Sequence, residues 1–471
     1  MNMDKLISCS PRLLAESLSG KRLLEEEISL PEKCFHVLLS TKQLIPIPAI
    51  ENQKGSVKCI RCGNTSKYYF SEYPCGICQQ KHLYCRNCIQ MGRISECKPL
   101  YRWNGAEVHW PKHSNPLTWE GKLTPAQSNA AAQLEKAVIE KLPACLCWAV
   151  CGAGKSEMLF PAITAALKQG KRIALASPRV DVIRELFPRL EQAFQDVTIE
   201  ALYGESEHKA GKSQLILSTT HQLMRYYQAF DVLIIDEVDA FPFYLDKSLM
   251  YAAKQAAKKQ STTLYLTATP RKNFRLQMKL GKLPHVFVPL RYHGHLLPVP
   301  KLKFAFHLTS QLANKKLPDA FRKWLINRKN PQRQLLIFGP KISMIKELKE
   351  VIILLLLQTG AISASEELQA VYAADKDREA KIKQFRNREL HALITTTILE
   401  RGVTFPSVDV AVLAAGHEVF NEAALVQIAG RAGRSADDPS GEVIFFHDGK
   451  TDAIEKARQM ILDMNERGRK L

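Results

Sequence analysis

The stretch that decides the fold is Ala149-Val150-Cys151-Gly152-Ala153-Gly154-Lys155-Ser156, which follows an apolar segment and precedes a helix-like one. A phosphate-binding loop requires this context, because backbone N–H groups at a strand-to-helix turn can surround phosphate oxygens. Gly152 and Gly154, on either side of Ala153, let the backbone approach the phosphates without Cβ clashes. Lys155 is expected to contact the β- and γ-phosphates of ATP, and the Ser156 hydroxyl to ligate Mg²⁺.

This loop needs a second motif to support it, because Ala149 stands where the usual pattern has its first glycine. An acidic run, Ile234-Ile235-Asp236-Glu237-Val238-Asp239, ends an apolar segment further along the chain. Carboxylates at the C-terminal end of a strand lie where ligands bind in an open parallel sheet. Asp236 is expected to hold Mg²⁺ through water, and Glu237 to orient and activate the attacking water. A solvated acidic loop is the alternative, and the phosphate loop upstream argues against it.

Short apolar segments around these motifs predict two α/β lobes. In the first lobe they lie at residues 145–150, 172–177, 214–218, 232–236 and 263–267, and several are separated by helix-like segments. A second series begins near residue 334 and continues at 391–395, 408–414 and 442–446. Such alternation predicts parallel sheets with crossover helices.

The chain therefore divides into a series of predicted segments. Thr124-Pro125 is typical of a helix start and marks the beginning of the first lobe. The Pro- and His-rich stretch 288–303 has little periodicity, which is typical of a linker. The expected segments are a helical N-terminal part (1–55), a cysteine module (56–100), a linker (101–122), lobe one (123–287), an inter-lobe linker (288–303), lobe two (304–450) and a C-terminal helix (451–471).

Six cysteines form three Cys-x-x-Cys pairs ahead of the first lobe, which indicates metal binding. The pairs are Cys59/Cys62, Cys75/Cys78 and Cys85/Cys88. One tetrahedral Zn²⁺ needs four ligands. The favoured set is Cys59, Cys62, Cys85 and Cys88, because Cys62-Gly63 and Tyr84-Cys85 look like two knuckle turns. The middle pair then supplies extra thiols or competes for the metal, and His82 is a bystander. Buried unligated cysteines explain a single residue such as Cys145 or Cys147, but not three closely spaced pairs.

Composition narrows the partners and the compartment. Lys and Arg total 66 against 47 Asp and Glu, a net charge of +19. This excess favours a polyanionic partner, nucleic acid first and an anionic membrane surface second, although a positive surface can also merely aid solubility. The N-terminus has no apolar core of signal-peptide length, and the aliphatic run at 351–357 is far shorter than a membrane span. A cytoplasmic protein without a disulfide framework is therefore expected.

Further motifs in the first lobe resemble those of superfamily-2 helicases, in the order that these proteins have. The resemblance implies two tandem RecA-like P-loop lobes preceded by a small four-cysteine zinc-binding module. Gln127 looks like the glutamine that reads the adenine edge. The motifs that resemble those gripping the nucleic-acid backbone are Ser177-Pro178-Arg179 and Ser218-Thr219-Thr220-His221, and Thr267-Ala268-Thr269 resembles the one that couples hydrolysis to lobe movement. Ordinary helix capping is the alternative for Ser177 and Thr219.

The second lobe carries two further motifs of the same superfamily. Residues 395–403, which include Gly402, resemble motif V, and Gln427-Ile428-Ala429-Gly430-Arg431-Ala432-Gly433-Arg434 resembles motif VI. The resemblance assigns Gln427, Arg431 and Arg434 to the catalytic site. Guanidinium groups suit the charge spread over a transferring γ-phosphoryl group better than Lys does. A surface Arg pair on a helix is the alternative, and the complete motif argues against it.

The combination of a four-cysteine module with these two helicase-like lobes resembles the ComFA family of competence proteins. The resemblance implies single-stranded DNA binding, DNA-stimulated ATP hydrolysis and help in pulling a transforming strand through the membrane channel. It also implies ComFC and DprA as partners, and peripheral attachment at the cytoplasmic face of the membrane. The Cys75/Cys78 pair departs from the family pattern. The resembling stretches are Leu83-Tyr84-Cys85-Arg86, Met91-Gly92-Arg93, residues 148–155, residues 235–242 and residues 395–402.

Two other functions are alternatives to DNA uptake. One is a replication-restart or repair helicase resembling PriA, but PriA-like proteins place their cysteines within the second lobe, whereas here they precede the first. The other is a non-enzymatic, zinc-dependent DNA-binding scaffold whose ATPase site has lost its function. The intact Lys155, Glu237 and Arg434 argue against it.

Overall fold

The computed structural model describes residues 10–53, 56–204, 206, 211–402 and 405–471. Contacts divide the chain into two compact units. The first comprises Met1–Lys122, Ser128–Cys147 and Ser156–Val286, and the second Leu123–Gln127, Trp148–Lys155 and Phe287–Leu471. The phosphate loop therefore belongs, by its contacts, with the C-terminal part of the chain.

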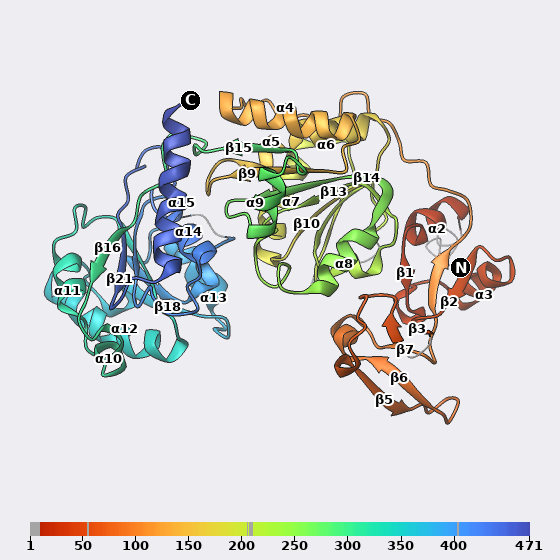
Figure 1. Cartoon of the computed structure of the whole chain (residues 1–471), viewed down its shortest axis with the longest axis horizontal. Helices are drawn as coiled ribbons and strands as arrows, with labels where there is room; N and C mark the ends of the chain where they lie inside the picture. Colours follow the sequence, from red (N-terminus) through yellow and green to blue (C-terminus); the bar gives the residue numbers. More distant parts are fainter. Residues whose placement is uncertain (1–9, 54–55, 205, 207–210, 403–404) are drawn as a thin grey trace. The chain divides into compact units, whose positions relative to one another are not determined.

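A seven-stranded sheet forms the centre of the first lobe, in the order β11-β12-β10-β13-β14-β9-β15. Figure 1 labels five of these strands, β9, β10, β13, β14 and β15. The strands are β9 (Ala144–Ala149), β10 (Ile173–Ser177), β11 (Ile199–Leu202), β12 (Leu215–Thr219), β13 (Phe230–Ile235), β14 (Ala257–Thr267) and β15 (His285–Val288). β10 pairs in parallel with β12 and β13 in register, with Leu175 opposite Leu217 and Ile234. These strands are buried on both faces, which explains their nearly continuous apolar sequence.

The helices of this lobe follow the expected alternation with strands. They are α4 (Pro125–Ile139), α5 (Lys155–Met158), α6 (Phe160–Lys168), α7 (Val180–Ala193), α8 (Lys247–Ala256) and α9 (Lys272–Lys279). Pro125 occupies the first position of α4, where its missing N–H costs no hydrogen bond. Alternating strands and helices confirm the predicted α/β class.

The N-terminal part combines helices with short strands. Helices α2 (Pro11–Leu18) and α3 (Glu32–Ser40) pack on a three-stranded sheet of β1 (Arg22–Leu23), β8 (Leu100–Trp103) and β2 (Leu44–Ile47). Segment 1–55, expected to be helical, thus also contains strands, and residues 1–9 and 54–55 lie outside the described part. Its charged run 25–27 forms the 3₁₀ turn η1 (Glu25–Glu27).

The cysteine module consists of two small sheets. β3 (Ile50–Gln53) pairs with β4 (Ser56–Cys59), and β5 (Phe70–Pro74), β6 (Lys81–Cys85) and β7 (Ile94–Ser95) form an antiparallel sheet. The 3₁₀ turns η2 (Lys67–Tyr69) and η3 (Arg86–Met91) flank this sheet.

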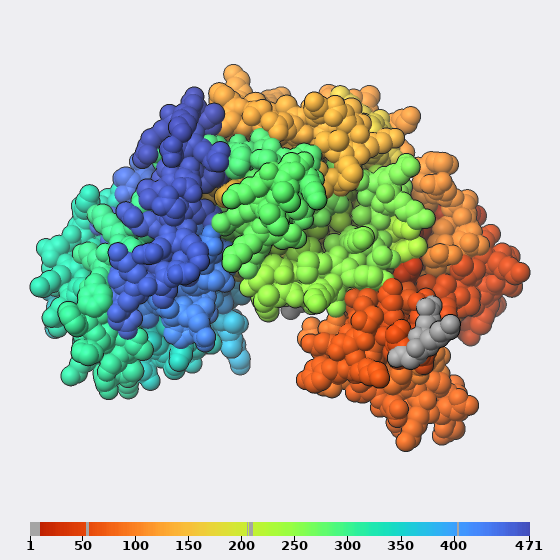
Figure 2. Space-filling model, in the orientation of Figure 1, coloured from red at the N-terminus to blue at the C-terminus, as the bar shows by residue number. Residues whose placement is uncertain are grey.

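The cysteine module and the first lobe share one apolar core, and Figure 2 shows them packed against each other. This core contains the four cysteines of the favoured set together with apolar residues of β10, β13 and α8. Glu27 adds an ionic link, because its carboxylate accepts from Arg61 of the module and, at 2.7 Å, from Nε of Arg225 in the lobe. Burial raises the pKa of Glu27, but Arg61 and Arg225 outweigh it and hold that pKa below its ordinary value. The module and the first lobe are therefore joined through a buried core, and not only through the linker between them.

The second lobe is a six-stranded parallel sheet in the order β16-β21-β20-β17-β19-β18. Its strands are β16 (Lys301–Phe304), β17 (Gln334–Phe338), β18 (Leu368–Val371), β19 (Ala392–Thr395), β20 (Val408–Val412) and β21 (Val443–His447). Its helices are α10 (Leu308–Ala313), α11 (Asp319–Ile326), α12 (Ile342–Gln358), α13 (Arg378–Arg386), α14 (Glu422–Ala429) and α15 (Asp452–Arg469). Two lobes with parallel sheets confirm the predicted architecture.

Two helices of the second lobe, α12 and α15, contain or contact stretches that the sequence analysis singled out. The aliphatic run 351–357 lies in α12, and within the described residues no helix is long and apolar enough to cross a membrane. The C-terminal helix α15 fixes the inter-lobe stretch 288–303, because the buried Asn465 exchanges two hydrogen bonds of 2.9 Å with the backbone of Leu297.

Candidate functional site

The phosphate loop has the backbone geometry that the sequence predicts. Gly152 and Gly154 have φ of 79° and 72°, a region that residues with a Cβ rarely adopt. Ala149, where the usual pattern has glycine, is the last residue of β9 and fully buried. The loop thus begins after Ala149, so an alanine causes no strain there. Lys155 begins α5, next to Ser156.

Gln127 is fixed to the phosphate loop. Its Nε2 donates to the carbonyl oxygen of Ala153 at 2.8 Å, and its Oε1 accepts from the backbone N–H of Thr124, also at 2.8 Å. Both ends of the buried amide are therefore engaged with the backbone. The position of the Gln127 side chain is therefore tied to the conformation of the phosphate loop. Its contact with adenine stays a prediction.

The acidic motif lies directly after β13, in the same sheet as β9. The backbone N–H of Asp236 donates to Ala176 of β10, and the Asp236 carboxylate accepts from the N–H of Glu237 at 2.8 Å. Glu237 has φ of 52°, a left-handed conformation that is unusual for a residue with a side chain. Such backbone strain is found preferentially at functional sites.

The acidic motif and the Thr267-Ala268-Thr269 motif are joined through the buried carboxylate of Asp239. Both its oxygens accept hydroxyl hydrogen bonds, from Thr267 and from Thr269, and Oγ1 of Thr267 accepts from the N–H of Thr269 at 2.9 Å. Arg271 donates to the Asp239 carbonyl at 3.3 Å. A displacement of the acidic loop would thus move the segment that follows β14.

We expect Thr269→Val to lower the free energy of unfolding by about 1–3 kcal/mol, because the buried Asp239 carboxylate loses a charge-assisted partner. Thr262→Val is the matched control, since the Thr262 hydroxyl makes only a 3.4 Å contact with the carbonyl of Ala137. Urea denaturation of both variants checks this. Equal destabilisation by the two substitutions would contradict the role given to Asp239.

The predicted strand-gripping motifs occupy strand ends of the same sheet. Ser177 ends β10, and its hydroxyl accepts from the N–H of Arg179 at 3.4 Å, so it also acts as a local turn cap. Thr219 ends β12, and Thr220 donates to the Ser177 carbonyl, which joins the two motifs. His221 lines a cavity of about 560 Å³.

Residues of the cysteine module and of the 218–221 motif line this cavity together. Tyr68, Tyr69 and Arg86 line it together with His221. Tyr68 is 72% exposed, and the Arg86 guanidinium lies 5.7 Å from the centre of its ring. An exposed aromatic ring beside a guanidinium is suited to stack on a nucleotide base.

Motifs V and VI lie in the second unit. Thr395 ends β19, and its hydroxyl donates to the Val371 carbonyl at 2.9 Å. Gly402 follows with φ of 75°, and Val403, the last residue of the predicted motif, lies outside the described residues. Arg431 is buried and donates to the Glu400 carbonyl at 3.1 Å, which links motif VI to motif V.

The phosphate loop contacts motif VI inside this unit. Sγ of Cys151 donates to Oε1 of Gln427 at 2.9 Å, and both side chains are buried. Arg434, the last residue of the motif, donates to the Gly430 carbonyl at 3.0 Å. The structure therefore brings Gln427 to the loop, and it holds Arg434 against its own helix end.

Sequence reasoning missed Arg291, which lies in the expected linker. Its guanidinium is buried and donates to the Gly433 carbonyl of motif VI. The next residue, Tyr292, donates its N–H to the Gly152 carbonyl at 2.9 Å. Burial first, and then Arg434, lowers the pKa of Arg291 to about 10. No motif in the sequence marks this residue, because its importance arises only from the folded linker.

The four favoured cysteines form a single buried group. Their sulfur atoms all lie within 4.8 Å of one another, with 3.7 Å between Cys59 and Cys88 and 3.6 Å between Cys62 and Cys85. A tetrahedral zinc–thiolate site with Zn–S bonds of about 2.3 Å has sulfurs about 3.8 Å apart, so the donor set fits Zn²⁺. Cys75 and Cys78 lie in a separate group with Cys97, a residue that the sequence analysis did not single out.

Comparison with known proteins places this arrangement in a family. Residues 7–102 match the model of the competence protein ComFA N-terminal domain, residues 120–272 that of the type III restriction enzyme res subunit, and residues 316–436 that of the helicase conserved C-terminal domain. Competence protein ComFA of Bacillus subtilis is 43% identical over 96% of this chain and 95% of its own. The Streptococcus pneumoniae protein of the same name is 37% identical over 96% of this chain and 98% of its own. The chain belongs to the ComFA family.

Solved helicase structures share the fold. Lhr of Mycobacterium smegmatis bound to single-stranded DNA has a TM-score of 0.53, 17% identity, and covers 73% of this chain and 48% of its own. Mss116p bound to single-stranded RNA has a TM-score of 0.51, 15% identity, and covers 76% and 80%. At these identities the likeness concerns the fold alone.

Membership of the ComFA family, together with the two helicase domains, makes the chain an ATP-dependent, helicase-like motor of competence DNA uptake. It is a superfamily-2 ATPase, and its helicase domains imply ATP and Mg²⁺ as cofactors. The resemblance read from the sequence is confirmed at the level of family, fold and enzyme class.

Proposed function

We propose that this ComFA-family chain moves along single-stranded DNA and draws it into the cytoplasm by repeated ATP hydrolysis. The observation that carries the proposal is the phosphate loop, with Gly152 and Gly154 at positive φ and Gln127 bonded to the Ala153 carbonyl. A basic chain of net charge +19 supports DNA as the track.

In this proposal each residue of the nucleotide site has a separate task. Lys155 neutralises the terminal phosphates, and the Ser156 hydroxyl with Asp236 would hold Mg²⁺, which supplies charge stabilisation when bound. Glu237 accepts a proton from the attacking water. Arg431 and Arg434 stabilise the charge that develops on the γ-phosphoryl group, and Gln427 positions them relative to the loop. Gly402 of motif V keeps the backbone close to the nucleotide.

Coupling to movement follows from the hydrogen bonds around Asp239. Loss of the γ-phosphate contacts would shift the acidic loop, and Asp239 would pass this shift to Thr267 and Thr269. The two predicted strand-gripping motifs, at 177–179 and 218–221, lie at the ends of neighbouring strands of the same sheet, so their hold on the DNA backbone would change with it.

The direct test measures ATP hydrolysis with and without single-stranded DNA, beside a streptavidin-displacement assay for movement along the strand. We expect hydrolysis to rise several-fold with DNA and streptavidin to be displaced from one end only. A rate that DNA does not change, or ATP-independent displacement, would overturn the proposal. A strand-separation assay run in parallel tells translocation from duplex unwinding.

We further propose that DNA stacks on Tyr68 and follows Arg86 toward His221. Tyr68→Ala is expected to cost about 1–3 kcal/mol of DNA binding and to leave the salt dependence unchanged, because stacking releases no counterions. Arg86→Ala is the matched variant, since the loss of one phosphate contact is expected to lower the slope of log affinity against log salt by about 1. Fluorescence anisotropy at several salt concentrations separates the two.

Identical behaviour of both variants would contradict this path. Tyr203→Ala is a suitable control, because Tyr203 lies on the same unit but does not line the cavity. We expect its DNA affinity to equal that of the unmodified chain.

Zinc and partners complete the proposal. Cys59, Cys62, Cys85 and Cys88 would hold a structural Zn²⁺, because four buried thiols at these distances fit a closed tetrahedral site. Membership of the family supports ComFC, DprA and the membrane DNA channel as partners, and peripheral attachment at the cytoplasmic face. Co-purification of ComFC and DprA with the tagged chain tests these partners. Fractionation with membranes at low salt, followed by release in a high-salt wash, tests peripheral attachment.

A further inference from the structure

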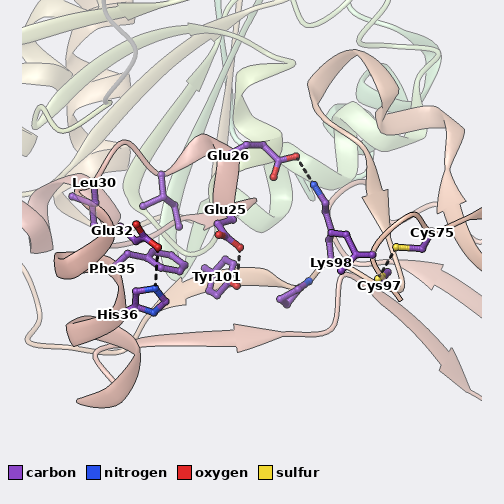
Figure 3. A pocket seen from close by; sticks show the side chains of 13 residues that line it. Glu25, Glu26, Leu30, Glu32, Phe35, His36, Cys75, Cys97, Lys98 and Tyr101 are labelled. Carbon is purple, nitrogen blue, oxygen red and sulfur yellow. Dashed lines mark hydrogen bonds and ion pairs between the residues drawn. The ribbon is translucent and has the colours of Figure 1, made fainter. Parts of the chain in front are cut away.

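Three cysteines outside the four-thiol centre also converge. Sulfur atoms of Cys75, Cys78 and Cys97 all lie within 4.8 Å of one another. Sγ of Cys97 is 3.4 Å from that of Cys75 and 3.7 Å from that of Cys78. Figure 3 shows the Cys75 and Cys97 side chains pointing toward each other at the edge of a cavity of about 650 Å³. Two of these residues come from one turn, and the third lies far along the chain.

The turn that carries Cys75 and Cys78 has the same pattern of backbone hydrogen bonds as the turn that carries Cys59 and Cys62 in the four-thiol centre. At the first centre the Cys59 N–H donates to Asn64 at 2.9 Å, and the Gly63 N–H donates back to Cys59 at 2.8 Å. In the second turn the Cys75 N–H donates to Gln80 and the Gln79 N–H donates back to Cys75, both at 2.9 Å.

The fourth residue after each first cysteine has a left-handed backbone. Gly63 has φ of 70°, and Gln79 has φ of 58°, although Gln79 carries a side chain. This conformation is uncommon for residues other than glycine. Its presence in both turns indicates that the second Cys-x-x-Cys pair is a metal knuckle of the same kind as the first.

β6 and the segment after β7 bring the remaining donors to this turn. The Leu83 N–H donates to the Glu96 carboxylate at 2.8 Å, and the Glu96 N–H donates to the Leu83 carbonyl at 3.0 Å, which fixes Cys97 beside β6. His82, on β6, lies outside the group of three mutually close thiols, but its Nε2 is 3.0 Å from Sγ of Cys78, so a small movement of the ring brings it to the metal position. Three thiols and an imidazole are a donor set that structural zinc sites use.

We propose that Cys75, Cys78, Cys97 and His82 form a second Zn²⁺ site. The thiols bind as thiolates, and their protons are released to solvent on binding. The chain then holds two zinc ions on interleaved ligands, because the second turn lies between the two pairs of the first centre. Cys75 and Cys78 are thus ligands in their own right, not spare thiols of the first site.

The second ion has a structural task at the tip of the β5–β6 hairpin. Ile77, between the two cysteines of the turn, is 85% exposed, so its side chain adds little apolar packing to the tip. A metal ion that joins this turn to Cys97 would hold the tip in place through its four metal–ligand bonds. It also fixes the wall of the cavity of about 650 Å³, which Cys75, Cys97 and Lys98 line.

The zinc content of the full chain, purified without chelators and measured by inductively coupled plasma mass spectrometry, tests the proposal. We expect two zinc ions per chain, one in Cys97→Ser, and two in the control Cys145→Ala, which alters a buried cysteine of β9 outside both groups. One zinc ion in both the unmodified chain and Cys97→Ser would overturn the second site and leave the first intact. The result is independent of the proposed motor function.

Cobalt titration of the metal-free chain gives a test that needs no variant. Two equivalents are expected to produce thiolate-to-cobalt bands, with an intensity that corresponds to seven thiolates. Saturation at one equivalent, or a Cys75–Cys97 disulfide found by mass spectrometry under non-reducing conditions, would overturn the proposal. His82→Ala is expected to weaken the second equivalent at least tenfold, and an unchanged titration would remove His82 from the ligand set.

Discussion

Glu237→Gln is expected to lower ATP turnover by about 10²–10⁴-fold while nucleotide binding persists, because the amide keeps the shape of the side chain but cannot accept a proton from water. Glu237 follows β13 in a strained left-handed conformation, and no such strain is needed for a merely solvated loop. A coupled ATPase assay measures turnover, and fluorescence of a labelled ATP analogue measures binding.

Lys155→Ala supplies the contrast for this experiment. It removes the charge that contacts the phosphates, so both binding and turnover are expected to fall. Glu191→Gln is the matched control, because Glu191 is an exposed residue of α7 outside the proposed site. Wild-type turnover in Glu237→Gln, or loss of nucleotide binding as severe as in Lys155→Ala, would contradict the role of Glu237 as the base.

Cys85→Ser is expected to remove zinc from the first centre and to lower the thermal midpoint of the first unit by roughly 10 °C, equivalent to about 3–5 kcal/mol. Cys85 is fully buried in the core that the module shares with β13 and α8, so a loss at the metal spreads into the lobe. Differential scanning fluorimetry and metal analysis of the same sample check both parts.

Cys145→Ala is the control for this experiment as well. It removes a buried thiol of the same unit but leaves the four-thiol centre whole, so zinc content is expected to stay unchanged and the midpoint to fall only slightly. A Cys85→Ser chain with full zinc content and an unchanged midpoint would show that other residues bind the ion.

The features that could be predicted from the sequence are those encoded locally. The phosphate loop, the acidic strand end and motif VI are short stretches in which spacing alone fixes the geometry, and two lobes follow from the alternation of strands and helices. Ala149 shows the limit of such patterns, because a strand that extends one residue further removes the need for glycine.

The features that sequence reasoning missed depend on contacts between distant residues. Cys97 has no partner cysteine nearby in the chain, and only the pairing of β6 with β7 brings it to Cys75. Arg291 lies in a stretch without periodicity, and its burial beside Gly433 follows from the path of the folded linker. The strands of the N-terminal part escaped notice because they are two to four residues long, too short for a period to register.

The common interior of the cysteine module and the first lobe has a practical consequence for work with fragments. A shortened chain that starts at Leu123 would expose the side chains of β13 and α8 that the module covers, and it would lose the partner of Arg225. Failure of such a fragment in an assay would report on solubility and folding, not on DNA recognition by the module. For the same reason, exchanging this module between relatives would require its lobe to be exchanged with it.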